Sequence, residues 1–544
     1  MALSSSNEVF DYVVVGSGFG GSVSALRLAE KGYRVLVIEK GKRFRDKDFA
    51  TTNWKIWKYL WIPFARCFGI LQLGFFRNVV VLHGAGVGGG SLGYAMVLEQ
   101  PGDELYQASP WRGLADWKSI MAPHYATAKR MLGLAENPRE WPGDAILREI
   151  AEEMGRGSTF RRTSVGAFFG QPGVEVPDPY FGGEGPARSG CIHCGACMVG
   201  CRYNAKNTLV KNYLYLAEKR GARVLAENEV TDVRPLPPNQ PDGARYEVIY
   251  RSSTAWFRKP ERFVRAHNVV FSAGVMGTLR LLFRCRDITG SLPDVSPRLG
   301  DYVRTNDEAL LGVISRDNKA NYSEGVAITS IFHPDDVTHV EPVRYPDGSS
   351  LMRFLAGPLI EASSNIGARL LKVLQQAVSH PLDFLRLMVI PGWAHRATIL
   401  LVMQNVDTHM HVRLGRSPLT LFRRNLVSQL SRGEYITPES RIGHRITRAF
   451  AEKSNGVPAG SISEALLDVP MTAHILGGCT FGRNAEEGVI DLQCQMHNYP
   501  GLFVIDNSII PANPGVNPSL TTTALAEYAM SYVPHKNGGV SAGT

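Results

Sequence analysis

A glycine-rich turn between two strand-like runs constrains this chain more than any other feature. An apolar run that begins at Tyr12 leads into Gly16, Gly18 and Gly21; a helical stretch (22–31) and a second apolar run follow. Glycines let the backbone approach a pyrophosphate at a helix N-terminus, where unpaired N–H groups and the helix dipole favour negative charge. The pattern predicts a dinucleotide-binding βαβ unit, whereas an isolated glycine motif would fit a structural turn equally well.

Glu39 ends the second run, about 20 residues after the glycines, where a carboxylate can accept hydrogen bonds from an adenosine ribose. An acid at this position disfavours a phosphorylated ribose. We therefore expect FAD or NAD rather than NADP, and this motif alone does not choose between the two.

Two later segments favour FAD. One is a second glycine-rich run (83–94) that contains Gly88, Gly89 and Ser91, and the other is a C-terminal run (501–518) that contains Asp506. A flavin dinucleotide needs a second close backbone approach and a carboxylate near its ribityl hydroxyls. Both segments can meet these needs.

Further motifs in residues 269–278, 471–478 and 515–527 complete a pattern that spans the chain. Together with the glycine-rich runs, they stand in the same order as in the glucose-methanol-choline (GMC) oxidoreductases. The chain resembles this family and, within it, the cholesterol oxidases that bind FAD non-covalently.

The resemblance implies an α/β fold with two discontinuous domains. A Rossmann-like FAD-binding domain is expected from residues 1–115, 190–310 and 465–544. A substrate domain with a mostly antiparallel sheet and lid-like helices is expected from residues 116–189 and 311–464.

The resemblance also implies cofactor contacts. Glu39 would bind the adenosine ribose, the backbone at Val230 the adenine, and Asp506 the ribityl chain. Family members usually carry a polar residue a few positions after Ser91. This chain has Tyr-Ala-Met at 94–96 instead, so that flavin contact is expected to differ.

An alcohol oxidoreductase must remove a hydroxyl proton and deliver a hydride to flavin N5, and imidazole suits the proton step. His474 matches the family's active-site histidine and Asn517 its polar partner. Glu308 is our candidate for a carboxylate that moves a steroid double bond after oxidation, although a solvated acid or an ion pair with Arg304 explains it equally well.

These residues predict oxidation of an apolar alcohol, a 3β-hydroxysteroid by resemblance, to its ketone; another hydrophobic alcohol fits them equally well. Three alternatives stay open at this point. They are a redox-neutral steroid isomerase, a flavin-dependent ketone or enone reductase, and a non-catalytic flavin and iron–sulfur electron carrier.

Four cysteines form a C-x2-C-x2-C-x3-C run: Cys191, Cys194, Cys197 and Cys201. The spacing is that of ferredoxins, although Arg202 replaces their proline and no second run is present. An iron–sulfur cluster, a zinc ion and four packed thiols are the three interpretations. A cluster would send electrons to a protein or quinone, and its absence would leave molecular oxygen as the acceptor. His409 and His411 could resemble a metal pair, but no third ligand accompanies them.

The composition excludes few partners. The formal charge is +9 over 544 residues, and the 59 Lys and Arg are scattered without a nucleic-acid-binding motif, so we expect no nucleic acid.

The first residues lack a signal-peptide pattern, which predicts a cytoplasmic protein. Residues 54–76 and 360–390 are apolar but interrupted by charges. They predict either buried helices and loops or a lid and surface patch that touches a membrane peripherally.

Overall fold

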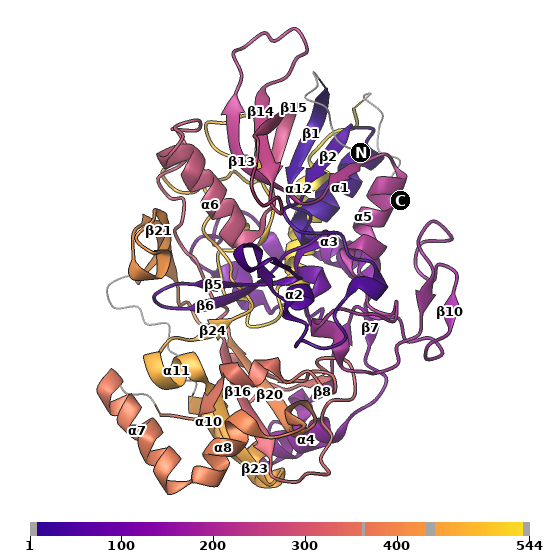
Figure 1. Ribbon diagram of the computed structural model, residues 1–544. Coiled ribbons are helices and arrows are strands. Elements are labelled where there is room, and N and C mark those ends of the chain that lie inside the picture. Colours follow the sequence, from indigo (N-terminus) through magenta and orange to yellow (C-terminus); the bar gives the residue numbers. More distant parts are fainter. Residues whose placement is uncertain (1–7, 362–364, 431–440, 537–544) are drawn as a thin grey trace.

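The computed structural model describes residues 8–361, 365–430 and 441–536. Figure 1 shows two layered regions, one above the other, which meet in the middle of the molecule. The upper region holds a mixed sheet and the lower region an antiparallel one. The predicted α/β fold class is confirmed.

The upper sheet has parallel strands at its centre and a hairpin at one edge. Val13 of β1 lies between Leu36 of β2 and Val269 of β15, and Leu502 of β25 also pairs with Val269. The hairpin of β13 and β14 adds antiparallel strands to β15. The strands are β1 (Val9–Val15), β2 (Val35–Ile38), β12 (Arg223–Leu225), β13 (Asn228–Pro235), β14 (Tyr246–Ser252), β15 (Arg262–Phe271) and β25 (Leu502–Val504).

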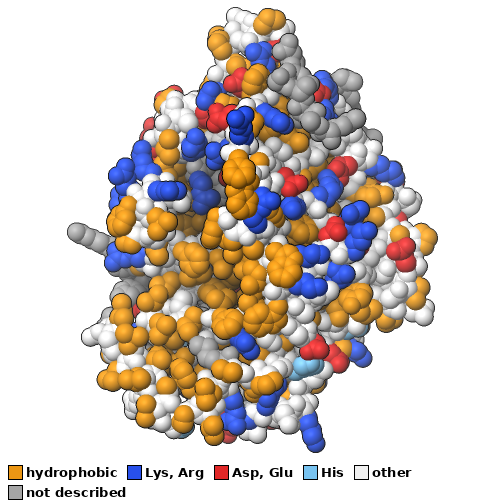
Figure 2. Space-filling view, viewed as in Figure 1, with side chains coloured by type: hydrophobic (Ala, Val, Ile, Leu, Met, Phe, Trp, Pro, Cys, Tyr) orange, Lys and Arg blue, Asp and Glu red, His pale blue; other side chains and the backbone are white. Residues whose placement is uncertain are grey.

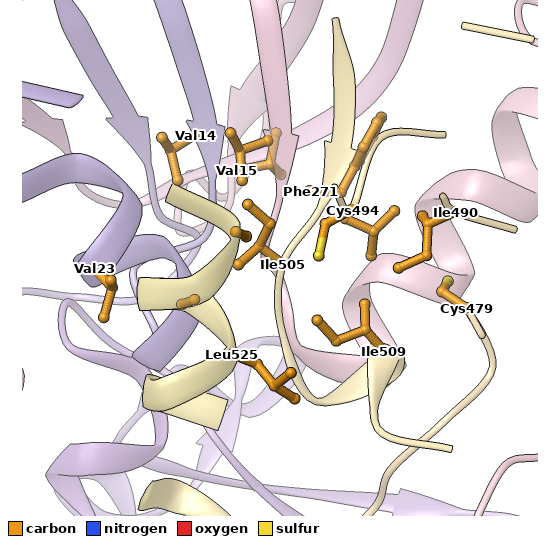
Figure 3. Packing of buried hydrophobic residues seen from close by; sticks show 14 of the residues in the cluster. Val14, Val15, Val23, Phe271, Cys479, Ile490, Cys494, Ile505, Ile509 and Leu525 are labelled. Atoms are coloured by element: carbon orange, nitrogen blue, oxygen red, sulfur yellow. The ribbon is translucent and has the colours of Figure 1, made fainter. Parts of the chain in front are cut away.

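Helices α1 (Phe19–Glu30), α12 (Ser519–Ser531), α3 (Trp117–Met131) and α5 (Tyr213–Lys219) pack together beside this sheet. The valines of β1 and the buried helix α12 form the centre of the core, and Figure 3 shows Val14 and Leu525 of these elements with Ile505, which follows β25. Segments from both ends of the chain therefore share one hydrophobic cluster.

The lower sheet is entirely antiparallel, with the order β18-β20-β16-β23-β19. Its strands are β16 (Ala309–Ser315), β18 (Thr338–Val343), β19 (Ala356–Pro358), β20 (Ala397–Gln404) and β23 (Gly456–Ser461). Side chains alternate between its faces. Leu400 and Val402 pack in one cluster with residues of α4 (Pro142–Glu153) and α10 (Arg441–Lys453), whereas Leu401 belongs to a different cluster on the other face.

A smaller sheet joins the two regions. β6 (Val80–Gly84) pairs with β5 (Leu71–Phe75) on one side and with β24 (Met471–Thr472) on the other. Helix α6 (Gly274–Asp287) follows β15 directly. The residues that end β6, β15, β24 and β25 consequently approach one another in the middle of the molecule.

Two helices project from the lower region: α7 (Ile366–Ser379) and α8 (Pro381–Val389) (Figure 1). Arg369 anchors α7 by an ion pair with Asp468 and a hydrogen bond to the carbonyl of Glu464. In the described part of the chain, no helix is both long and apolar enough to cross a membrane.

The segment 54–76 contains both buried and exposed aromatic side chains, and its contact with a membrane stays a prediction. It forms the short helix α2 (Ile56–Tyr59) and small strands, and Tyr59 is buried whereas Trp57 and Phe64 are exposed.

Our domain boundaries stay a prediction. Helix α3, which we assigned to the substrate domain, packs against α12 on the side of the upper sheet because its tryptophan and tyrosine side chains join that core.

Candidate active site

A cavity of about 740 Å³ lies between the two regions. Glu39 and Val230 line it at the end formed by the upper sheet, and His474 and Asn517 line it where the lower sheet begins. The cavity therefore connects the predicted adenosine site to the predicted reaction site.

The N-terminus of α1 opens onto this cavity. Its N-cap residue is Gly18, which provides no side-chain hydrogen bond to the first turn, so the N–H groups there are left for a ligand. A Cβ on Gly89 would lie 2.6 Å from the Cα of Gly18, so the two glycine-rich runs touch. A Cβ on Gly18 itself would meet no atom within 4 Å. This cradle fits the pyrophosphate of a dinucleotide.

Glu39 is held at the edge of the cavity by backbone and side-chain donors. The N–H and hydroxyl of Ser17 donate to one of its oxygens at 3.0 and 2.8 Å, and the N–H of Gly41 donates to the other at 2.8 Å. Our sequence reasoning missed Ser17, although its position between two motif glycines was a usable signal. The carboxylate keeps acceptor capacity for a ribose hydroxyl.

Val230 lines the cavity and lies next to an irregularity in the pairing of β13 with β14, where the register shifts between Val230 and Asp232. Asp506 lies deeper and is buried. It accepts hydrogen bonds from the N–H and hydroxyl of Ser508 and from the hydroxyl of Thr278. Burial nevertheless raises the pKa of Asp506 above that of an ordinary aspartate.

Three predicted cofactor residues shape the cradle and do not line it. A Cβ on Gly21 would lie 2.2 Å from the carbonyl oxygen of Gly16, so this glycine permits close packing of α1 on β1. The N–H of Gly88 donates to the hydroxyl of Ser17, and the hydroxyl of Ser91 donates to the carbonyl of Gly88. Gly16, Gly18 and Gly89 line the cavity themselves.

His474 and Glu308 meet at the reaction end. Nδ1 of His474 lies 3.0 Å from Oε2 of Glu308. The same carboxylate oxygen accepts from the hydroxyl of Thr472 and the N–H of Ala473. Arg304, which we considered as a partner for Glu308, forms its ion pair with Asp407 instead.

The charge near His474 makes its imidazole a stronger base. Burial by itself would lower the pKa of His474, but the carboxylates of Glu308 and Glu341 outweigh this effect and raise the pKa. With Nδ1 directed at Glu308, Nε2 is the nitrogen left for a ligand in the cavity.

Asn517 contacts a residue that our sequence reasoning missed. Its Nδ2 donates to Oε2 of Glu341 at 3.3 Å, and its Oδ1 is buried without a partner among the described residues. Glu341 lies on β18, 176 residues away, and no local motif marks it. Only the fold brings this carboxylate to the site.

At the reaction end, apolar side chains form the rest of the wall, whereas charged side chains such as Lys40, Arg280 and Arg284 line other parts of the cavity. The lower sheet contributes Leu310, Val343, Ile399 and Leu401, which share one face of the strands. Leu71, Tyr345 and Met352 extend the wall. This end can hold a large apolar molecule with one polar group directed at His474.

The four clustered cysteines line a second, small cavity, and Met96 lines both this cavity and the large one. The N–H of His193 donates to the sulfur of Cys191 at 3.4 Å. Burial raises the pKa of Cys191 to about 12. Within residues 8–361, 365–430 and 441–536, no three His, Cys, Asp or Glu side chains are placed to hold a metal ion.

That finding also bears on His409 and His411. Nδ1 of His411 lies 2.9 Å from a carboxylate oxygen of Asp301, and the two histidine rings are 6.0 Å apart. The described residues give this pair no set of metal ligands.

Comparisons with known proteins agree with this geometry. Residues 439–526 match the GMC oxidoreductase model, and residues 14–45 match a model for NAD(P)-binding Rossmann-like domains. A cholesterol oxidase of Acinetobacter baumannii is 44% identical over 98% of this chain and 95% of its own. The chain belongs to the GMC oxidoreductase family. A cholesterol oxidase of Mycobacterium tuberculosis is also 44% identical, over 97% of this chain and 91% of its own.

Solved structures show the same fold at low sequence identity. The pyridoxine 4-oxidase of Mesorbium loti superposes with a TM-score of 0.60 at 16% identity and covers 96% of this chain and 99% of that one. Family membership makes the protein an FAD-dependent alcohol oxidoreductase. The glycine cradle, Glu39 and the buried Asp506 fit the pyrophosphate, adenosine ribose and ribityl parts of FAD, respectively.

The contact between Glu308 and His474 leads to a testable pH effect. His474 accepts a proton only when it is neutral, so activity is lost as the pH falls through its raised pKa. In Glu308→Gln the nearer carboxylate is gone, the pKa of His474 falls, and the acid limb of flavin reduction by an alcohol moves to lower pH.

Stopped-flow measurement of flavin reduction across the pH range tests this effect. Glu229→Gln is the matched control because Glu229 lines the same cavity at its adenosine end. An unchanged acid limb in Glu308→Gln would show that this carboxylate does not set the basicity of His474.

Proposed function

We propose that this protein oxidises the hydroxyl of a 3β-hydroxysteroid to the ketone and passes the electrons to molecular oxygen. One observation carries the proposal: at the reaction end, His474 and Asn517 face a long apolar wall in the same cavity. This shape suits a rigid apolar alcohol with one hydroxyl. The two cholesterol oxidases at 44% identity support the same substrate class and acceptor.

In this proposal, Nε2 of His474 accepts the hydroxyl proton. Glu308 stabilises the imidazolium that forms, and it holds the ring through its contact at Nδ1. When bound, FAD supplies the hydride acceptor at N5. The apolar wall excludes water and holds the carbinol carbon in one orientation.

Asn517 adds a neutral amide at the same end, and its oxygen is buried without a partner among the described residues. The role of Glu308 in moving a double bond stays a prediction. Its contacts to Thr472, Ala473 and His474 favour a positioning role.

The proposal predicts that a 3β-hydroxysteroid bleaches the flavin bands without oxygen and that hydrogen peroxide forms in air. We expect His474→Ala to lower kcat by about 100-fold or more, because a general base contributes roughly 10²- to 10⁴-fold. The matched 3-deoxysteroid, which lacks the hydroxyl, serves as the control and should leave the bands unchanged. Double-bond migration without bleaching would instead identify an isomerase.

We also propose that the helical hairpin of α7 and α8 contacts a lipid bilayer, the source of an apolar substrate. Its exposed hydrophobic side chains are Ile366, Leu370, Leu371, Leu374, Val378, Leu382, Leu385 and Val389. Figure 2 shows a broad hydrophobic area where these helices lie, continuing toward a hollow in the middle of this face.

The charges of the hairpin agree with this contact. Helix α7 has no acidic residue, and Asp383 of α8 is paired with Arg316 and Arg386. A helix pair with one apolar face and few free negative charges is typical of interfacial contact. We propose that the protein is peripheral to the membrane.

We expect Leu371→Glu to weaken binding to phosphatidylcholine vesicles by about tenfold or more, because burying one leucine contributes roughly 1.5–3 kcal/mol. Turnover of substrate dissolved in detergent should not change. Val174→Glu, which adds the same charge at another exposed apolar site, is the control in vesicle sedimentation. Equal binding by both variants would exclude the hairpin as the contact.

As a second candidate, which would replace oxygen by a protein or quinone as the electron acceptor, we propose that Cys191, Cys194, Cys197 and Cys201 bind an iron–sulfur cluster. Their spacing and their shared cavity support it. A single zinc ion would draw the thiolates to about 2.3 Å from one point. In an iron–sulfur cluster, by contrast, the thiolates would bind different iron atoms and need not converge on one point. Because Met96 lines both cavities, such a cluster would lie beside the large cavity.

Protein purified without oxygen should contain iron and acid-labile sulfide in a fixed ratio to the chain. We expect Cys194→Ser to lose most of the iron, whereas Cys67→Ser, at a cysteine outside the run, should keep it. Absence of iron from the native protein would leave the cysteines as structural thiols.

A further inference from the structure

Two fully buried polar residues lie behind Asn517. His339 and Glu341 are two positions apart on β18 and so project from the same face of the strand. Their side chains are 1% and 0% exposed. Neither residue lines the large cavity, and neither belongs to a motif that we identified in the sequence.

His339 forms a direct hydrogen bond with Glu341. Nε2 of His339 lies 2.8 Å from Oε1 of Glu341. A carboxylate away from water is costly in its ionised form unless a donor or a positive charge compensates it. The imidazole N–H of His339 provides that donor at Oε1 of Glu341 and leaves Oε2 to accept from another group.

Whether the carboxyl group of Glu341 accepts or donates a hydrogen bond determines how the amide of Asn517 is oriented. An ionised carboxylate can only accept hydrogen bonds, so it must meet the NH2 group of the amide, as the 3.3 Å contact from Nδ2 shows. The amide oxygen is then left for the cavity that Asn517 lines. A neutral carboxylic acid could donate to that oxygen, and the amide could turn to present its NH2 group instead.

The surroundings of His339 are compatible with this role. The ring of His333 lies 5.0 Å from that of His339 and nearly perpendicular to it. Burial, with the neighbouring His339, lowers the pKa of His333 to about 4, so His333 is neutral at pH 7. The charged residues beside it, Arg161 and Glu99, pair with each other at 2.6 Å.

We infer that His339 is a positioning residue for the oxidation: it keeps Glu341 a hydrogen-bond acceptor and thereby fixes the amide of Asn517 with its oxygen toward the cavity. The inference deepens the proposed function and rests on it, because Asn517 must act on the ligand at that cavity. His339 itself touches neither the cavity nor its ligand.

The test uses FAD-loaded protein and the 3β-hydroxysteroid. We expect His339→Leu, which removes the donor at similar size, to lower kcat by about 10-fold or more with KM changed little, because orientation acts on the reacting geometry. His339→Gln, whose amide N–H can reach Glu341, should keep kcat within about threefold of the wild type. His333→Gln alters the adjacent ring without touching Glu341 and is the control.

Two further measurements separate positioning from loss of structure. Glu341→Gln keeps the shape and removes the charge, and we expect it to match His339→Leu; the double variant should be no worse than either single variant, because the residues act as one unit. The flavin absorption bands without substrate should shift alike in the two single variants and stay unchanged in His339→Gln.

The outcomes are distinct. Additive losses in the double variant, wild-type kcat in His339→Leu, or an equal loss in His339→Gln would overturn the positioning role. If His339→Leu does not fold, the comparison of Glu341→Gln with His339→Gln decides the question by the same spectral criterion. A wild-type protein that does not oxidise the alcohol contradicts the proposed function, and in that case the flavin bands of the variants still test the orientation of Asn517.

Discussion

The pairing of β15 with strands from both ends of the chain is the constraint on which the rest of the structure depends. β1 lies along one edge of β15, and β25 lies along the other beyond the end of β14. Because these strands are parallel, their carboxyl ends meet, and ligands of open α/β sheets bind at such edges. Gly16, Ser272 and Asp506 follow these three strands and all line the large cavity.

Close backbone contacts make this convergence specific. A Cβ on Gly16 would lie 2.3 Å from the carbonyl oxygen of Ser272, and a Cβ on Gly20 would lie 1.8 Å from that of Ile505. The glycines that admit a pyrophosphate therefore also let the N-terminal, central and C-terminal segments approach. Cofactor binding and assembly of the core use the same small residues.

The reaction end depends on two buried carboxylates with different partners. Glu308 lies against the imidazole of His474 and raises its basicity, whereas Glu341 accepts from Asn517 and is bonded to His339. The negative charge at this end is thus placed next to the two residues that act on the ligand, and the lower sheet gives the adjoining wall apolar side chains. Such an arrangement separates proton transfer from recognition of an apolar substrate.

The sequence by itself determined the dinucleotide fold, the family and the residues within its motifs, because glycine spacing, Glu39 and His474 lie in local patterns that backbone chemistry requires. Only the tertiary structure decided the partners of those residues. Ser17 gains its role by reaching Glu39, and Glu341 reaches Asn517 across 176 residues through the antiparallel sheet. A strand residue such as Glu341 looks like any other acid in the sequence, since its function depends on burial and on a long-range contact.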